Sequence, residues 1–177
     1  MRVISGIYKG KNILGYDIEG TRPTMDRVKE SMFATIQNKV KNKVFLDLFS
    51  GTGSLGIEAL SNGASKVYFV DNNPEVIKVL KKNLDGMEDY EILMTDYNKA
   101  LKSFRDNNQK FDVILLDPPY HRHFINKILD FIYDNNMLTS DGIVVCEYED
   151  EKVNIDKYNV YRTKKYGSKT VTVFDTK

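Results

Sequence analysis

Between residues 44 and 147, short apolar runs alternate with amphipathic segments, and this alternation constrains the fold more than any other feature of the chain. The apolar runs are rich in Val, Ile, Leu and Phe, which favours buried strands, whereas the segments between them carry apolar residues at helical spacing. Because parallel strands need crossover connections, the alternation predicts an α/β fold with a parallel sheet and helices on both faces. The expected strands are residues 44–49, 66–71, 91–94, 111–116 and 143–147.

Helix signals occupy the intervals between these strands. Gly63 is expected to end the helix that follows the first strand, and Asn73 and Pro74 are expected to cap and open the next helix. Two further helices are predicted over residues 97–107 and 123–134. Residues 158–163 and 169–174 then alternate apolar and polar side chains around a turn at 166–168, which predicts an antiparallel hairpin. The complete sheet is therefore expected to have seven strands, most of them parallel.

About 40 residues precede this core. Residues 1–14 contain short β-like pieces broken by Gly6 and Gly10, and residues 25–40 show a helical apolar face. The chain has no internal repeat and no low-complexity linker. We therefore expect one structural domain, in which a β-plus-helix extension (residues 1–43) packs on a core formed by residues 44–177.

Composition excludes several classes of protein. The 177 residues are 41% apolar and 29% charged, which is typical of a globular domain. No apolar run approaches the ~20 residues that a membrane-spanning helix needs, and the start of the chain lacks a long apolar stretch. A lone cysteine (Cys146) allows no internal disulfide, so a cytoplasmic protein is expected. Two histidines and one cysteine do not form a common zinc site, and we expect no metal.

The net charge of +1 hides an uneven distribution. Residues 1–43 carry nine Lys/Arg against four Asp/Glu, and residues 157–177 carry six against one, whereas the central part is acidic. If both ends fold onto the same side of the core, they form a basic rim suited to phosphates. The alternative is an ordinary solvated surface.

A glycine-rich turn follows the first strand in Asp47-Leu-Phe-Ser-Gly51-Thr-Gly53-Ser-Leu-Gly56. Glycines let the backbone approach a ligand closely, and the start of a helix offers N–H groups without intrahelical partners. Asp71 ends the second strand, where a carboxylate can accept hydrogen bonds from ribose hydroxyls. A nucleoside-containing cofactor is therefore predicted here, with a tight turn that binds nothing as the alternative.

Two cofactor classes compete for this turn. A nicotinamide dinucleotide uses a similar glycine pattern, but its pyrophosphate would be repelled by Asp47 just ahead of the glycines. The same carboxylate suits the cationic amino-acid end of S-adenosylmethionine. The chain also has only one nucleotide-binding half. S-adenosylmethionine is favoured, and an NAD-dependent oxidoreductase stays the rival interpretation.

The second motif is Asp117-Pro118-Pro119-Tyr120, directly after the most apolar strand. Ligand sites in open α/β sheets lie at the carboxyl ends of strands, and two consecutive prolines stiffen the loop and remove two N–H donors. The Asp117 carboxylate and the Pro118 carbonyl are then available to hold the hydrogens of an amine on a nucleic-acid base. Tyr120 offers a ring on which the base can stack, worth about 1–3 kcal/mol. A rigid turn without chemistry is the alternative.

Three further residues carry weaker signals. Asp96, at the end of the third strand, either meets the adenine of the cofactor or serves as an ordinary helix N-cap. His121 and His123 are expected to lie on the surface or to contact RNA rather than to act in catalysis.

The two motifs, in this order, resemble the amino-methyltransferase branch of the Rossmann-like class I methyltransferases. The stretches Arg2-Val-Ile-Ser-Gly6, Arg22-Pro-Thr-Met-Asp-Arg27-Val-Lys-Glu30 and Gly56-Ile-Glu-Ala-Leu60 are similar to the bacterial 16S ribosomal RNA (guanine 2-amino)-methyltransferase family of the RsmD type. The resemblance extends from residue 2 to Val171-Thr-Val-Phe174. It implies methyl transfer from S-adenosylmethionine, with S-adenosylhomocysteine as product, to the 2-amino group of a guanine in the small subunit.

The resemblance also implies roles for individual residues. Asp117, Pro118 and Tyr120 would hold the target guanine. The cofactor would be bound by Asp47, Phe49, Gly51, Gly53, Asp71, Asn72 and Asp96, with Arg22 and Thr24 at the junction with the RNA. RNA contacts would come from Arg2, Lys9, Lys11, Arg27, Lys164, Lys165 and Lys169. Because the RNA-contacting surface is small, we expect the substrate to be a partly assembled subunit, and we expect a monomer.

Three alternatives remain open on the sequence alone. A DNA adenine or cytosine amino-methyltransferase would use the same motifs, although such enzymes usually carry an added recognition region. An NAD-dependent oxidoreductase gives no role to Asp117-Pro-Pro-Tyr120. A non-catalytic RNA-binding protein would not need both motifs intact.

Overall fold

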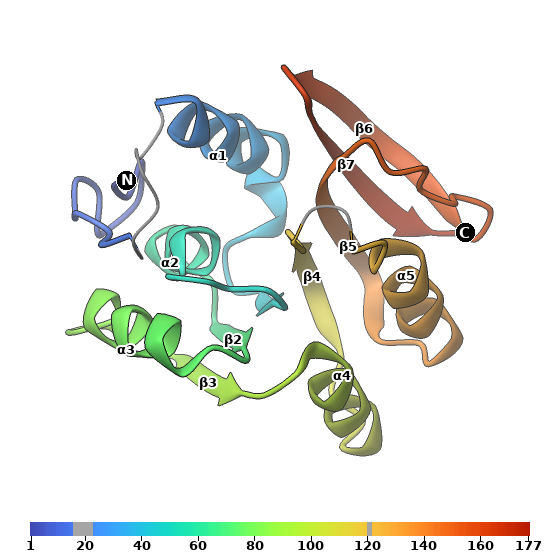
Figure 1. Ribbon diagram of the computed structural model, residues 1–177, viewed down its shortest axis with the longest axis horizontal. Helices are drawn as coiled ribbons and strands as arrows, with labels where there is room; N and C mark the ends of the chain where they lie inside the picture. Colours follow the sequence, from blue (N-terminus) through green and yellow to red (C-terminus); the bar gives the residue numbers. More distant parts are fainter. Residues whose placement is uncertain (16–22, 120–121) are drawn as a thin grey trace.

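A computed structural model describes residues 1–15, 23–119 and 122–177; for residues 23–25 it describes the backbone alone. A seven-stranded sheet with the strand order β3-β2-β1-β4-β5-β7-β6 runs through the molecule (Figure 1). The strands are β1 (Val44–Asp47), β2 (Lys66–Asp71), β3 (Tyr90–Met94), β4 (Phe111–Leu116), β5 (Leu138–Glu149), β6 (Tyr158–Tyr166) and β7 (Lys169–Thr176). The helices are α1 (Pro23–Thr35), α2 (Ser54–Ser61), α3 (Pro74–Asn83), α4 (Tyr97–Asp106) and α5 (Ile125–Asp134), with a 3₁₀ turn at Gln37–Lys39.

The order of the strands creates a switch point beside β1. After β1 the chain moves to β2 and β3 on one side, and then returns to β4 and β5 on the other. All of these neighbours are paired in parallel, whereas β7 is antiparallel to both β5 and β6. In such a sheet, ligands bind outside the carboxyl ends of the strands that flank the switch point, here β1 and β4. The predicted fold class and the C-terminal hairpin are confirmed.

Two apolar layers hold the helices onto the two faces of the sheet. Successive strand residues point to opposite faces, so Phe45 packs with α1, α2 and α3 while its neighbour Leu46 packs with α4 and α5. Figure 1 shows this division of the helices between the faces. The expected helix signals are confirmed: the Asn73 side chain accepts a hydrogen bond from the Glu75 N–H, and Gly63 follows α2 with a φ of 94°.

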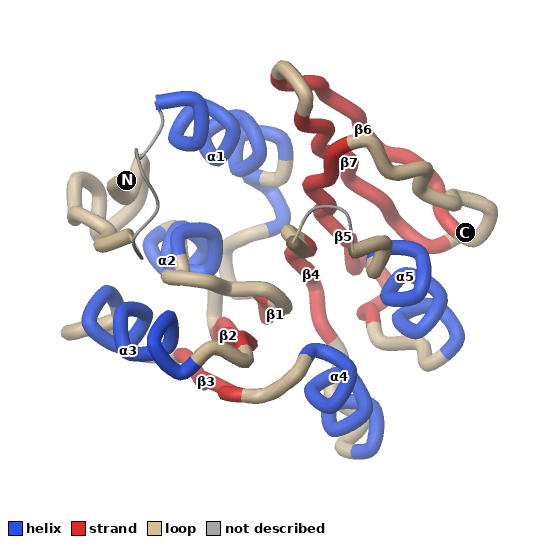
Figure 2. The backbone as a smooth tube through the Cα atoms, viewed as in Figure 1, coloured by secondary structure: helices blue, strands red, loops and turns tan. Residues whose placement is uncertain are grey.

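The N-terminal segment, residues 1–15, lies beside α2 as an irregular loop (Figure 2). In place of the expected strands it has one isolated bridge, between Arg2 and Asn12. Its hydrogen bonds go to the core instead, because the Ile7 N–H donates to the Ser61 carbonyl and Asn83 bonds both backbone groups of Leu14. Gly6 permits this approach: a Cβ there would lie 2.0 Å from the Ser61 carbonyl oxygen.

Two predicted boundaries differ from the structure. The helix expected over 25–40 ends at Thr35, and the chain continues through the 3₁₀ turn to the buried Val40. The fifth strand begins at Leu138 rather than at 143, with an irregular register opposite Phe111. Residues 140–142, which were expected to form a turn, lie inside this strand because residues on both sides of them pair with β4. Leu138 pairs with Phe111, and Ile143 pairs with Val113. Of the helices described here, none combines the length and apolar character that a membrane crossing requires.

Candidate active site

Two adjoining cavities lie at the carboxyl ends of the central strands, with volumes of about 940 and 300 Å³. The larger one is at the upper end of the range for small-molecule sites, roughly 300–1,000 Å³. The shared lining comes from α1, the glycine turn, α3, the loop after β4, and the start of β7. These shared residues are Val28, Phe49, Gly51, Val76, Asp117 and Lys169. Both sequence motifs therefore meet at one place.

The two glycines of the turn have different tasks. Gly51 lines both cavities with a φ of 54°, and a Cβ there would meet nothing within 4 Å. Gly53 lines neither cavity; it begins α2 with a φ of 93°, and a Cβ would lie 2.4 Å from a Leu80 methyl group. Gly51 thus offers open space to a ligand, whereas Gly53 lets α2 pack against α3. The Gly51 N–H donates to Asp71 at 3.0 Å, which ties the turn to the end of β2.

Asp47 is a buried carboxylate below this turn. Its side chain accepts a hydrogen bond from the Gly56 N–H at 3.0 Å, and the residue is 2% exposed. Burial raises the pKa of Asp47 to about 7, with a smaller upward contribution from the charge of Asp71 and an opposing one from the Gly56 hydrogen bond. Asp47 lines the smaller cavity. A cation placed there would stabilise the ionised form.

Ser50 supplies a second indication that the smaller cavity receives a ligand. The residue is 8% exposed, and its hydroxyl has no hydrogen-bond partner among the residues that the structure describes. Buried hydroxyls without partners are uncommon and costly. A cationic and polar ligand end beside Asp47 and Ser50 would satisfy both groups, so these residues fit the amino-acid end of S-adenosylmethionine.

The opposite end of the larger cavity is formed by the ends of β2 and β3. Asp71 accepts from the Asn73 N–H at 2.9 Å, and Asn72, Asn73 and Asp96 line the wall beside it. Asp96 caps α4 by accepting from the N–H groups of Asn98 and Lys99. The helix-cap interpretation of Asp96 is confirmed; its contact with an adenine stays a prediction.

Three aromatic rings gather along this cavity. The centroids of Phe49 and Tyr97 are 5.3 Å apart, and those of Tyr97 and Phe124 are 4.9 Å apart. All three residues line the larger cavity. Their exposed faces provide an apolar surface on which a planar ring can pack. Phe49 was expected in this site; Tyr97 and Phe124 were not.

The loop after β4 brings Asp117, Pro118 and Pro119 into the wall of the larger cavity. Burial is the main reason why the pKa of Asp117 is raised well above its usual value; Glu147 and Asp47 raise it further and Lys169 opposes them. When ionised, the Asp117 carboxylate is therefore a stronger proton acceptor than the carboxylate of a solvated aspartate. Tyr120 and His121 lie outside the described residues. His123 is exposed, and Arg122 lines the larger cavity.

The β6–β7 hairpin closes the remaining side of the cavity. Tyr166, Gly167, Ser168 and Lys169 line it at the hairpin turn. The Tyr166 hydroxyl hydrogen-bonds the Ser31 hydroxyl of α1, and the Lys164 ammonium donates to the same oxygen at 3.0 Å. The last two strands and α1 are thereby held together over the site.

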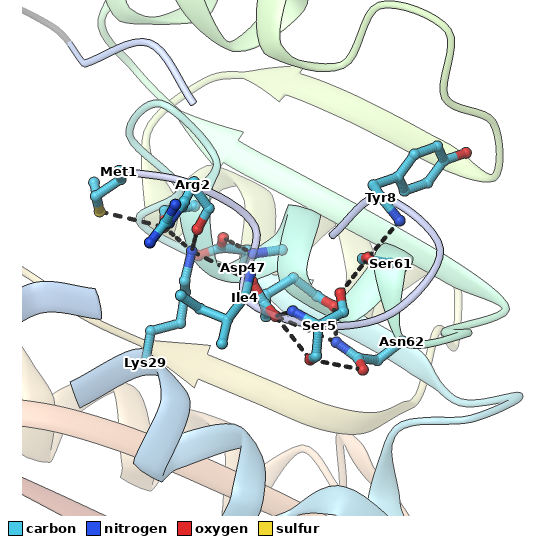
Figure 3. A network of polar contacts seen from close by, with 12 residues as sticks. Met1, Arg2, Ile4, Ser5, Tyr8, Lys29, Asp47, Ser61 and Asn62 are labelled. Atoms are coloured by element: carbon cyan, nitrogen blue, oxygen red, sulfur yellow. Dashed lines mark hydrogen bonds and ion pairs between the residues drawn. The ribbon is translucent and has the colours of Figure 1, made fainter. Parts of the chain in front are cut away.

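A buried polar network holds the N-terminal segment and α1 against α2 (Figure 3). The Lys29 ammonium donates to the Arg2 carbonyl at 2.8 Å and lies 3.3 Å from a Glu58 oxygen. Glu58 also accepts from the N–H groups of Ile4 and Ser5 at 3.0 Å. Burial lowers the pKa of Lys29, and the Glu58 charge opposes that effect. Lys29 is 2% exposed and lines the smaller cavity, so the network also supports the site.

The residues expected to contact RNA fall into two groups. Arg2, Lys9, Arg27 and Lys165 are exposed; Lys11 donates to the Asp85 carbonyl, and Lys164 reaches Ser31. Lys169 differs, because it lies in the cavity wall and pairs with Glu147 at 3.0 Å. Arg22 lies outside the described residues, and Thr24 is placed in the first turn of α1 by its backbone alone.

Several cavity residues were not found from the sequence. Tyr97 follows Asp96 directly and could have been included as its neighbour. The hairpin residues 166–168 and the acid Glu147 carry no local signal. The pairing of β5 with β7 brings the hairpin to the site, and the pairing of β5 with β4 brings Glu147 there.

Comparison with known proteins places these motifs in a family. A family model described as "conserved hypothetical protein 95" matches residues 1–175. Ribosomal RNA small subunit methyltransferase D from Haemophilus influenzae is 36% identical over 163 residues, which cover 90% of this chain and 84% of that protein.

Solved structures share the fold. The structure of yhhF from Escherichia coli superposes with a TM-score of 0.84 at 25% identity, covering 100% of this chain and 98% of that one. SMU.776, which was solved in complex with SAH, gives a TM-score of 0.69 at 16% identity, covering 82% of this chain and 48% of that one, a likeness of fold alone. The chain therefore belongs to the family described as conserved hypothetical protein 95 and is a relative of ribosomal RNA small subunit methyltransferase D.

Proposed function

We propose that this chain is a methyltransferase that transfers a methyl group from S-adenosylmethionine to the 2-amino group of a guanine in 16S ribosomal RNA. The observation that carries the proposal is that Asp117 and Pro118 line the same cavity as Gly51 and Asp71. The printed name of the Haemophilus influenzae relative supports an RNA of the small ribosomal subunit as substrate.

The proposed cofactor site uses both cavities. Asp47 and Ser50 would take the amino-acid end, Asp71 the ribose hydroxyls, and Asp96 with Asn72 the adenine side. Phe49, Tyr97 and Phe124 supply apolar surface for the ring. The bound cofactor supplies an electrophilic methyl group, so the chain needs no metal for this reaction.

Asp117 performs two tasks in this proposal. The 2-amino group of guanine is a poor nucleophile because its lone pair is delocalised into the ring. Hydrogen bonds from its two N–H groups to the Asp117 carboxylate and the Pro118 carbonyl orient the lone pair, and positioning of this kind contributes several kcal/mol, roughly 7–11 in favourable cases. When the new N–C bond forms, the nitrogen must lose one proton, and the raised pKa of Asp117 suits its carboxylate to accept it.

The RNA would approach over the basic residues of both chain ends. α1 lies between the N-terminal segment and the hairpin (Figure 1), and the contacts of Lys29 with Arg2 and of Ser31 with Lys164 fix this arrangement. Thr24 and Arg27, in the first turns of α1, would join the cofactor site to the RNA, and we propose the same role for Arg22. We propose a cytoplasmic monomer that acts on a partly assembled small subunit; equal rates on protein-free RNA would contradict that last point.

The test is incubation with methyl-labelled S-adenosylmethionine and small subunits that lack the modification, followed by nucleoside analysis. Label in 2-methylguanosine is the expected result. Label on DNA instead would favour a DNA amino-methyltransferase, which uses the same two motifs. Failure to bind the cofactor would contradict the role assigned to the glycine turn, and NAD would then be tested.

A further inference from the structure

Three charged side chains lie on three adjacent strands at the wall of the site, with Lys169 one step further along the sheet than Glu147, opposite Glu149. Asp117 follows β4, Glu147 lies in β5, and Lys169 begins β7, and these strands are neighbours in the order β4-β5-β7. Leu116 of β4 pairs in parallel with Cys146 of β5, so the next residues along the two strands, Asp117 and Glu147, are neighbours across the sheet.

All three side chains point to the same face of the sheet. Each is two positions along its strand from an apolar residue of the core layer under α1, namely Leu115, Val145 and Val171. Strand residues two apart share a face. The three charged groups therefore converge on the space that α1 covers, and Asp117 and Lys169 line both cavities there while Glu147 lines the smaller one. A base that reaches Glu147 would share the smaller cavity with the amino-acid end of the cofactor, which is proposed to lie on the side of Asp47 and Ser50.

Glu147 and Lys169 form an ion pair at 3.0 Å, with side-chain exposures of 8% and 27%. Removing such charges from water is costly, and a buried ion pair contributes little net stability compared with apolar residues of similar size. The pair also acts on Asp117, whose pKa is raised by Glu147 and lowered by Lys169. Because the pair lies beside the proposed methyl acceptor, its two charged groups are candidates for binding the target base.

The Watson–Crick edge of guanine presents two donors and one acceptor in a fixed order: the 2-amino group, the N1–H and O6. Across the strands, the wall offers a carboxylate, a second carboxylate and an ammonium, which are two acceptors and one donor in the same order. Adenine presents a lone pair at N1 and an amino group at position 6. With adenine in this position, the N1 lone pair would face the Glu147 carboxylate, so that two acceptors meet. The 6-amino group would face the Lys169 ammonium, so that two donors meet.

We propose that Glu147 and Lys169 select guanine, Glu147 by accepting the N1–H and Lys169 by donating to O6, while Asp117 holds the 2-amino group. The inference rests on the proposed function and names its specificity-determining residues. It gives Lys169 a base contact in place of a phosphate contact. Selectivity arises because the wrong base places an acceptor opposite the Glu147 carboxylate and a donor opposite the Lys169 ammonium, so neither charged group receives a hydrogen bond.

The experiment compares guanine with 2,6-diaminopurine at the modified position of reconstituted small subunits. Diaminopurine keeps the 2-amino group but replaces O6 by an amino group and the N1–H by a lone pair. The wild-type protein should prefer guanine by roughly 10⁴-fold in kcat/KM, the scale on which sites built to hydrogen-bond a substrate reject analogues. Glu147→Met and Lys169→Met should each reduce the preference for guanine over diaminopurine by at least about 100-fold. Because both charges also act on Asp117, the rate on diaminopurine serves as the baseline for each variant.

Controls separate recognition from folding. Lys66 and Glu91 form an exposed inter-strand ion pair at 3.2 Å outside the cavities, and Lys66→Met and Glu91→Met should keep the wild-type preference. Lys169→Arg retains a donor and should restore most of the preference. Equal losses on both bases, or no preference in the wild-type protein, would overturn the inference while 2-methylguanosine formation still upheld the function. Absence of 2-methylguanosine with the wild-type protein would overturn both.

Discussion

Asp47 combines deep burial with a position beside the glycine turn, which gives it a defined pH response. Its pKa of about 7 exceeds the ordinary value of 3.8, so the folded protein holds a proton that the unfolded chain releases. A raised carboxyl pKa costs stability as pH rises from about 3.8 towards 7, and the cost is constant above that. A bound cationic ligand offsets this cost because it favours the carboxylate.

Cofactor binding should therefore depend on pH. Below pH 7 the Asp47 carboxyl must lose its proton before it can hold the cationic end, so the Kd for S-adenosylmethionine should rise about tenfold per unit between pH 6.5 and 5.5. Titration calorimetry in buffers of different ionisation heat checks this and should show proton release at pH 6. Asp71 and Asp117 also act electrostatically with Asp47. A slope that persists in Asp47→Asn would contradict the assignment of the effect to Asp47.

Asp117→Ala should remove nearly all methyl transfer, leaving at most about 1% of the wild-type rate, while the Kd for the cofactor stays within a few-fold. The alanine removes an acceptor that positions the amine and receives its proton, and losses of about 10²–10³ in rate are expected for such groups. Single-turnover transfer and cofactor binding measure the two effects separately. Asp106→Ala, at an exposed acid of α4, is the control. Full activity in Asp117→Ala would refute the proposed chemistry.

At the scale of elements, the Lys29–Glu58 pair joins α1 to α2 and both to the N-terminal segment. Glu58→Gln leaves the Lys29 ammonium buried without its carboxylate, and breaking a buried pair costs roughly 3–5 kcal/mol. Urea unfolding should show this loss. Glu91→Gln breaks the exposed pair with Lys66 and should change the free energy of unfolding by less than about 1 kcal/mol. Similar effects of the two substitutions would mean that the buried network is not a structural anchor.

The elements that could be predicted from sequence are those with local signals. The Asn73-Pro74 start of α3 and the Gly63 end of α2 are set by capping chemistry, and both are confirmed. The β-like pieces predicted within residues 1–14 pair with one another only at the Arg2–Asn12 bridge, because most of their backbone groups are satisfied through Ser61, Asn83 and Glu58. The glycine turn and the Asp117 loop could be predicted as one site because strand ends meet at a switch point, whereas the place of Glu147 beside Asp117 required the register of β5 with β4.

At the scale of the whole molecule, the basic chain ends should make RNA binding sensitive to salt. The slope of log K against log salt concentration is proportional to the number of phosphates that the protein neutralises, about 0.7–0.9 for each. Replacing Lys9 and Lys165 together by Gln should therefore reduce the slope by roughly 1.5, measured by filter binding to small subunits between 50 and 200 mM salt. Lys102→Gln, on α4 at the far end of the molecule in Figure 1, should leave it unchanged. An unaltered slope in the double variant would exclude these lysines from phosphate binding.

The hairpin wall has a consequence for the order in which the enzyme becomes competent during its own synthesis. The glycine turn and Asp117 are complete once two thirds of the chain has been translated, but Tyr166 and Lys169 close the site from its last strands. Until β6 and β7 have been synthesised and have paired with the rest of the sheet, the pocket stays open on the side that Tyr166 and Lys169 close. Tight ligand binding should therefore begin only after β7 has folded onto β5.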